Sequence, residues 1–212
     1  MVQKTMGSLM SKLPFDFEQY KNILGKREST DNWKAKNRLG YLGRYQLGAP
    51  ALIDAGLVKP GTTNKGLKNP KNWTYGNMNV FLNSPTLQDK ALETYTQKNY
   101  RALQSKGMLD DGVHPGHVAG LLGASHLVGA TGAEEALVKG KDVKDANNIK
   151  PQDYYTMLST GFGLKQQTQP RLKAEPTSVD PAAYLSKGIV EEKPGMFENL
   201  GNELMAKVRG LF

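Results

Sequence analysis

The sequence predicts a mainly α-helical globular domain with a small glycine-rich hairpin or loop region. Apolar residues recur three and four positions apart in several stretches, most clearly over 86–106, which is the spacing of an amphipathic helix. Glycines concentrate between positions 40 and 61, where they favour tight turns. Apolar residues make up 38% of the 212 residues and the mean hydropathy is −0.53, so the chain can bury one good core.

The first helix of this domain is expected to begin near Asp16. Asp16 and Gln19 stand in the N-cap and N3 relation of a capping box. Phe17 and Leu24 share one face, and at about 100° per residue Glu28 returns to within about 20° of Phe17. Glu28 is therefore expected to face inward at the last turn, where burial and the helix dipole favour its protonated form.

The following elements are mostly helical. Pro50 suits the first turn of a short helix over 49–58. Further helices are expected over 86–106, 118–129, 133–139 and 151–158, and a loop over 66–79. Trp73 and Tyr75 in that loop either cover the core, which is the favoured interpretation, or stack on a sugar. Pro115 and Gly116 are expected to form a turn.

Both ends of the chain are expected to lie outside the domain, which we place at 14–164. Residues 1–13 and 196–212 each show an apolar stripe at helical spacing, so each is expected to form an amphipathic helix. Residues 165–195 are rich in proline and are expected to form an extended linker. The terminal helices either dock on the domain or bind a partner or membrane surface.

Glu28-Ser29, followed by the block GYLGRYQLGAPAL at 40–52, indicates a catalytic site. Glycine lets the backbone approach a ligand closely, and aromatic and amide side chains suit a polyhydroxylated, N-acetylated polymer. A carboxylic acid beside such a surface could donate a proton to a glycosidic oxygen. The alternative is that Glu28 only ends an amphipathic helix, with its carboxylate in solvent.

Three blocks, which span about residues 16–160, resemble the lysozyme-like lytic transglycosylases and the muramidase domains of phage virion proteins. They are Glu28-Ser29, then Gly43-Arg44-Tyr45-Gln46, then the segment LGASHLVGA at 122–130. Tyr45 stands where methionine is usual. The resemblance implies an α+β lysozyme-like fold for the mainly α chain and Glu28 as the single catalytic acid and base. It also implies a set of substrate-binding residues: Ser29, Tyr45, Gln46, His126 and Tyr154.

The count of acids favours one-acid chemistry. Ordinary glycosidases use two carboxylates. Between Glu28 and Gln46 the only other acid is Asp31, which is expected in a turn, and Asp54 is expected on a helix surface. A lytic transglycosylase that cleaves the β-1,4 MurNAc–GlcNAc bond and leaves a 1,6-anhydro sugar is therefore the preferred function. A hydrolytic muramidase and a non-catalytic structural component of a phage tail or baseplate are the alternatives.

The three histidines do not predict a metal site. His114, His117 and His126 lack an acidic motif placed as in zinc proteases, and the turn expected between the first two does not suit helical i, i+4 ligands. No cofactor and no metal are predicted.

The charge predicts a polyanionic partner. The formal net charge is +8 and the pI about 9.5. Lysines and arginines are spread throughout, without a basic run, zinc-finger spacing or RNA motif, so nucleic acid is not expected as the primary partner. Peptidoglycan glycan strands are the expected partner, and other virion proteins are the expected partners of the terminal helices.

Targeting signals are few. The chain has no cysteine, so its stability does not depend on disulfides. No stretch approaches the about 20 apolar residues of a transmembrane helix. Lys4 and Lys12 interrupt the first apolar stretch, so no secretory signal is expected. A virion-associated protein that is delivered to the cell wall would meet these constraints.

Overall fold

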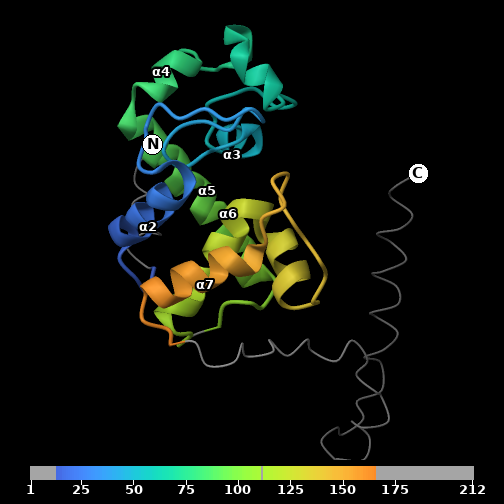
Figure 1. Cartoon of the computed structure of the whole chain (residues 1–212). Coiled ribbons are helices and arrows are strands. Elements are labelled where there is room, and N and C mark those ends of the chain that lie inside the picture. Colours follow the sequence, from blue (N-terminus) through green and yellow to red (C-terminus); the bar gives the residue numbers. More distant parts are fainter. Residues whose placement is uncertain (1–12, 111, 166–212) are drawn as a thin grey trace, which may run out of the picture. The chain divides into compact units, whose positions relative to one another are not determined.

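The fold is mainly helical, as predicted (Figure 1). The computed structural model describes residues 13–110 and 112–165, all within one unit, Met1–Lys173. Its helices are α2 (Phe17–Ser29), α3 (Ala49–Asp54), η1 (Lys65–Lys68), η2 (Pro70–Asn72), α4 (Met78–Leu82), α5 (Pro85–Ser105), α6 (Pro115–Leu137) and α7 (Pro151–Gly161). The expected helices over 1–13 and 196–212 and the linker over 165–195 lie, except for Leu13 and Lys165, outside the described residues. Across the described ranges, no helix has the length and apolar content to cross a bilayer.

Helix α2 begins where its N-cap predicts. The Asp16 side chain accepts a hydrogen bond from the Glu18 backbone N–H at 2.8 Å. The reciprocal half of the capping box is wrong, because the Gln19 amide donates instead to the Gly161 carbonyl at 2.8 Å. Gln19 thereby ties the start of α2 to the end of α7, which matters because both helices supply side chains to the site described below.

The expected hairpin is reduced to isolated bridges. Leu42 pairs with Lys36 on one side and with Leu47 on the other, and no longer strand forms within the described residues. Gly43 has a φ of +77°, and a Cβ there would overlap the Gln88 side chain of α5. Glycine at this position therefore lets α5 approach the backbone of the segment.

The segment from α3 to α4 has a core of its own. Helix α3 ends at Asp54, earlier than the expected 58, and Val58 then forms a bridge with Trp73. Trp73 is 6% exposed and its indole N–H donates to the Leu67 carbonyl at 2.9 Å, so its interpretation as a core residue is confirmed. Tyr75 is 69% exposed. The interval expected to be loop contains η1, η2 and the start of α4.

Helices α5, α6 and α7 pack together, with α6 and α7 side by side (Figure 1). Helix α5 is capped by Ser84, whose hydroxyl accepts from the Leu87 N–H at 3.3 Å, and it follows the predicted boundaries. Two glycines of α6 permit the close approach of α7: a Cβ on Gly120 would lie 2.9 Å from the Tyr155 carbonyl oxygen, and one on Gly123 would overlap Leu158.

Helix α6 departs from the prediction at both ends. The expected turn at Pro115 and Gly116 is wrong, because these residues form its first turn and the His114 ring accepts from the Gly116 N–H at 3.0 Å. The helices expected over 118–129 and 133–139 are joined, with a kink at Gly129 (φ 72°, ψ 167°) between them. This conformation is open to glycine and costly for other residues.

Candidate functional site

Glu28 lies at the end of α2 in a half-enclosed polar environment. Its side chain is 12% exposed, and its Oε1 accepts a hydrogen bond from the Tyr154 hydroxyl of α7 at 2.7 Å. No hydrogen bond reaches Oε2 from the described residues. Burial and then the neighbouring Glu28 charge raise the pKa of Tyr154, so this phenol keeps its proton and remains a donor. The expectation that Glu28 faces inward is confirmed.

His126 of α6 is the second neighbour of the Glu28 carboxylate. Its Nε2 lies 3.4 Å from Glu28 Oε1 and 3.0 Å from the Tyr45 carbonyl oxygen. Because a carbonyl only accepts, Nε2 must carry a proton in this contact. Its Nδ1 is buried without a hydrogen-bond partner among the described residues. The Tyr95 ring of α5 lies edge-on to the imidazole, with the ring centroids 6.0 Å apart.

A cavity of about 50 Å³ opens beside Glu28. It is lined by Glu28, Asn37, Tyr41, Gln46, His126, Leu127, Asp145 and Asn147. A second cavity of about 340 Å³ shares four of these residues, including Tyr41 and Gln46, and continues along Gly48, Pro50 and Gly129. Together they form a polar pocket continued by a more apolar one, on the scale of small-molecule sites.

Gln46 reaches this pocket through an unusual backbone. Its φ is +45°, in the left-handed region that non-glycine residues seldom occupy. The side-chain amide nitrogen donates to the Gly43 carbonyl at 2.8 Å, which fixes the side chain against its own turn. The sequence placed Gln46 near Glu28 correctly, and the two residues line the same cavity.

Three predicted site residues, Ser29, Tyr45 and Tyr154, line neither cavity, and of these only Tyr154 contacts the Glu28 carboxylate. The Tyr45 ring is fully buried, so the prediction that this ring lines the groove is wrong; its contribution is the carbonyl that contacts His126. The Ser29 hydroxyl donates to the Arg44 carbonyl at 2.8 Å and accepts from the Asn32 N–H at 3.0 Å. Ser29 therefore joins the end of α2 to the glycine-rich segment and does not contact the Glu28 carboxylate.

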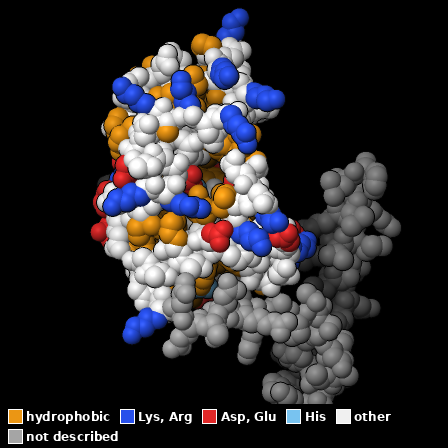
Figure 2. Space-filling view, in the orientation of Figure 1, with side chains coloured by type: hydrophobic (Ala, Val, Ile, Leu, Met, Phe, Trp, Pro, Cys, Tyr) orange, Lys and Arg blue, Asp and Glu red, His pale blue; other side chains and the backbone are white. Residues whose placement is uncertain are grey.

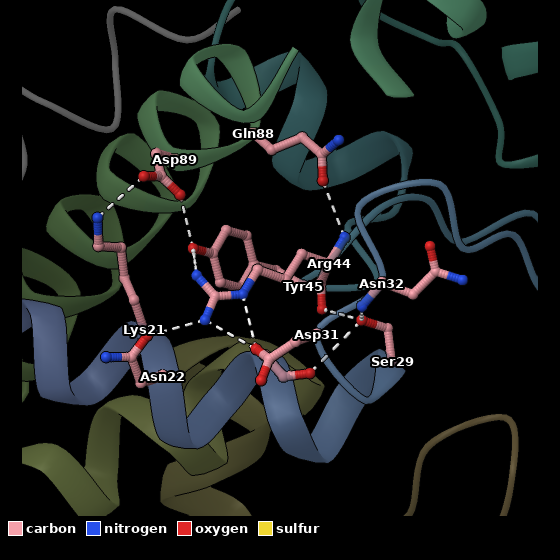
Figure 3. Close-up of polar contacts among 10 residues, drawn as sticks. Lys21, Asn22, Ser29, Asp31, Asn32, Arg44, Tyr45, Gln88 and Asp89 are labelled. Atoms are coloured by element: carbon pink, nitrogen blue, oxygen red, sulfur yellow. Dashed lines mark hydrogen bonds and ion pairs between the residues drawn. The ribbon is translucent and has the colours of Figure 1, made fainter. Parts of the chain in front are cut away.

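A polar network supports the pocket from behind (Figure 3). The Tyr45 hydroxyl donates to Asp89 of α5 at 2.6 Å, and Asp89 also pairs with Lys21 of α2 at 2.9 Å. Arg44 stacks over the Trp33 and Tyr45 rings and contacts Asp31. These contacts lock the segment that carries Gln46 onto α2 and α5.

Three acids other than Glu28 have ion-pair or hydrogen-bond partners. Asp31 pairs with Arg44 at 2.7 Å and Asp54 with Lys98 at 2.5 Å. Asp145, the other acid that lines the pocket, accepts from the Asn147 N–H at 2.9 Å and from the Ile149 N–H at 2.7 Å. Its carboxylate organises its own turn.

The predicted site residues include three of the eight residues that line the cavity beside Glu28, namely Glu28, Gln46 and His126. Asn37 precedes the glycine-rich block and Tyr41 lies within it, and the Asn37 side chain accepts from the Leu39 and Tyr41 N–H groups. Asp145 and Asn147 come from the polar turn between α6 and α7. The position of this turn in the sequence could have predicted their place, because the turn joins the two helices that carry His126 and Tyr154.

The other two histidines have separate surroundings. His114 caps α6, and His117 Nδ1 lies 2.6 Å from the Tyr155 hydroxyl. Burial and then His114 lower the pKa of His117. Within the described residues, no group of three or more His, Cys, Asp or Glu side chains is arranged to hold a metal ion.

Comparisons of the chain with protein families, with characterised proteins and with solved structures find no match.

Proposed function

We propose that this chain is a virion-associated lytic transglycosylase that cleaves the β-1,4 bond between MurNAc and GlcNAc in peptidoglycan. One observation carries the proposal: Glu28, 12% exposed, opens onto a polar cavity while Tyr154 donates to one of its two oxygens. The motif resemblance supports the identity of the substrate, and the amide and aromatic lining suits an N-acetylated glycan.

The hydrogen bond from Tyr154 decides which carboxyl oxygen carries the transferable proton. Oε1 of Glu28 accepts from Tyr154, so the proton of the neutral acid resides on Oε2. In the first step this proton moves to the glycosidic oxygen, and the C1–O bond breaks with its electron pair on that oxygen. The substrate acetamido carbonyl supplies electrons to C1.

The second step returns the proton. The Glu28 carboxylate takes the proton of the muramyl 6-hydroxyl as that oxygen bonds to C1 and displaces the acetamido group. Glu28 is again neutral, the product is a 1,6-anhydro sugar, and no water is consumed. Tyr154 stabilises the carboxylate between the two steps by donating to Oε1, and the His126 Nε2–H, which donates to the Tyr45 carbonyl, lies 3.4 Å from the same oxygen.

The environment of the other acids favours this one-acid scheme. A hydrolytic mechanism needs a second free carboxylate as base or nucleophile. Asp31 and Asp54 each form an ion pair, and Asp145 accepts two backbone hydrogen bonds. Asp145 nevertheless lines the same cavity as Glu28, and this observation makes hydrolysis by a muramidase the second candidate.

Product analysis separates the two candidates. Purified glycan strands are digested with the full chain and the products are weighed by mass spectrometry. Transglycosylation predicts 1,6-anhydro ends, 18 mass units lighter than reducing ends, about one water. Reducing muramic acid ends that disappear in Asp145→Asn would instead identify a hydrolase with Asp145 as its second carboxylate.

The role of Glu28 is tested in a zymogram. Glu28→Gln is expected to lower clearing by about 10²- to 10⁴-fold, the usual contribution of a general acid. Glu18→Gln, an exposed change on the same helix, is the matched control. No clearing by the parent chain, with binding to the wall retained, would support a non-catalytic component of a tail or baseplate.

A further inference from the structure

Most of the net positive charge of this chain arises in one interval of the sequence. Cations occur throughout, but acids do not: residues 32–88 contain eight Lys or Arg residues and one acid, Asp54. This interval therefore carries +7 of the formal net charge of +8. The eight cations are Lys34, Lys36, Arg38, Arg44, Lys59, Lys65, Lys68 and Lys71.

Seven of these cations, all except Arg44, form what we call the cationic surface. Each is exposed, and none makes an ion pair within the part of the chain that the structure describes. Six lysines of residues 98–150, by contrast, pair with acids. Lys and Arg side chains outnumber Asp and Glu over the α3–α4 part in Figure 2.

The backbone that carries the cationic surface is held in place by buried contacts. Trp73 and Leu67 are buried and joined by a hydrogen bond, which anchors the loop over 59–71. The Asn64 side chain accepts from the Ala49 N–H at 2.7 Å and so ties this loop to α3. The lysine side chains therefore extend from fixed positions, which lowers the entropy lost when they bind a ligand.

The cationic surface adjoins the pocket. Asn37 lines the cavity with Glu28, and its chain neighbours Lys36 and Arg38 are exposed. Lys65 follows Asn64, whose partner Ala49 stands between Gly48 and Pro50 in the wall of the larger cavity. A polymer that lies in the pocket would therefore have positive charge within reach beside it.

We infer that the cationic surface binds the pendant carboxylates of the polymer whose neutral sugar backbone enters the pocket; this inference rests on the proposed function. Among the residues that the structure describes, the cavity beside Glu28 is lined by Asp145 and by no Lys or Arg, so a polymer with an anionic backbone, such as a nucleic acid, would find no cation there to pair with its phosphates. A glycan with carboxylate-bearing peptide stems fits both surfaces. Its uncharged sugar rings can enter the pocket that Asp145 lines, and its stem carboxylates can pair with the lysines of the cationic surface.

The test measures binding of the full chain to insoluble peptidoglycan by co-sedimentation in rising salt. All proteins carry Glu28→Gln, so that cleavage does not remove the ligand. The test variant adds Lys36→Gln, Arg38→Gln, Lys65→Gln and Lys68→Gln. The control adds the same charge change at exposed cations that form no ion pair among the described residues: Lys26→Gln, Lys90→Gln, Arg101→Gln and Lys165→Gln.

The test variant is expected to bind at least about tenfold more weakly at low ionic strength, with a flatter salt dependence, because each lysine or arginine near an anionic surface contributes. The control is expected to stay within about twofold of the parent. Amidation of the peptidoglycan carboxyl groups should reduce binding of the parent to the level of the test variant. Thermal melts confirm that both variants fold.

Three results would overturn the inference: equal weakening in test and control variants, unchanged binding to amidated peptidoglycan, or stronger displacement by single-stranded DNA than by soluble peptide-bearing glycan. The last would identify a nucleic-acid surface. Failure of the proposed function is seen separately, as absence of clearing by the chain with Glu28 intact. Binding that depends on the cationic surface would then stand without catalysis.

Discussion

The region over residues 32–83 and the helices α5 to α7 are built in opposite ways. The first consists of turns, isolated bridges and short helices, held by contacts such as Trp73 with Leu67 and Asn64 with Ala49. The second consists of long helices that approach closely at glycines, with its lysines largely paired to acids. Six lysines of residues 98–150 form ion pairs, whereas seven of the eight cations of residues 32–83 form none among the described residues.

The two regions contribute different residues to the candidate site. Tyr154 and His126 come from the helices α5 to α7, which we call the helical side, and Gln46 comes from residues 32–83, which we call the turn-built side; all three lie around Glu28. The helical side contacts the Glu28 carboxylate. The turn-built side lines the pocket and carries the exposed cations, so changes in the two regions should affect different observables.

The largest expected effect is on the stability of the turn-built region. Trp73→Ala should lower the free energy of unfolding by about 3–5 kcal/mol, because it empties a buried indole site. Urea denaturation measures this. Tyr75→Ala, at 69% exposure two residues away, should change it by less than about 0.5 kcal/mol. Similar losses from both would mean that this region lacks a core of its own.

The helical side is tested through its contact with Glu28. Tyr154→Phe removes the donor to Oε1 and should lower the rate of glycan cleavage about 10- to 100-fold, since a hydrogen bond to a charged group is lost. The melting temperature reports any accompanying loss of fold. Tyr155→Phe, which removes the contact with His117, is the control and should leave cleavage nearly unchanged. Equal rate losses would place Tyr154 outside the mechanism.

The glycine contact between α6 and α7 gives a comparable test of packing. Gly120→Ala places a Cβ 2.9 Å from the Tyr155 carbonyl oxygen, a backbone atom that cannot move alone. Unfolding free energy should fall by about 1–3 kcal/mol. Thr131→Ala, an exposed change on the same helix, should be nearly neutral. A neutral Gly120→Ala would show that the two helices pack less closely than described.

The smallest expected effect is a pH dependence of stability. Burial lowers the pKa of His117 in the folded chain, so the unfolded chain takes up a proton first as pH falls through the ordinary value of 6.5. Unfolding free energy should therefore decrease below this pH, and His117→Gln should flatten the decrease. Thermal melts across pH 5 to 8 measure it, about the range in which histidine titrates. A decrease that persists in His117→Gln but vanishes in His114→Asn would assign it to the cap.

Local signals predicted the helices well. Asp16, Ser84 and Pro151 mark helix starts at the expected positions, because capping and proline preferences act within a single turn. The turn-built region was harder to predict. Its short helices depend on the packing of Trp73 and on the Asn64 contact with Ala49, which join residues that no local pattern connects.

The candidate site was predictable only in part. Helical periodicity turned Glu28 inward, and the glycine-rich block placed Gln46 in the pocket lining. The buried Tyr45 hydroxyl is bonded to Asp89 and Arg44, whereas Tyr41 lines the cavity. Such differences depend on tertiary contacts, which a single sequence does not display.

The hydrogen bond from Tyr154 leaves Glu28 with two unequal oxygens. A glycan strand has a reducing and a non-reducing end. If Glu28 donates its proton only from Oε2, as proposed, the strand must bind across the pocket in one direction. Chemical analysis of the new termini in a partly digested strand would identify that direction.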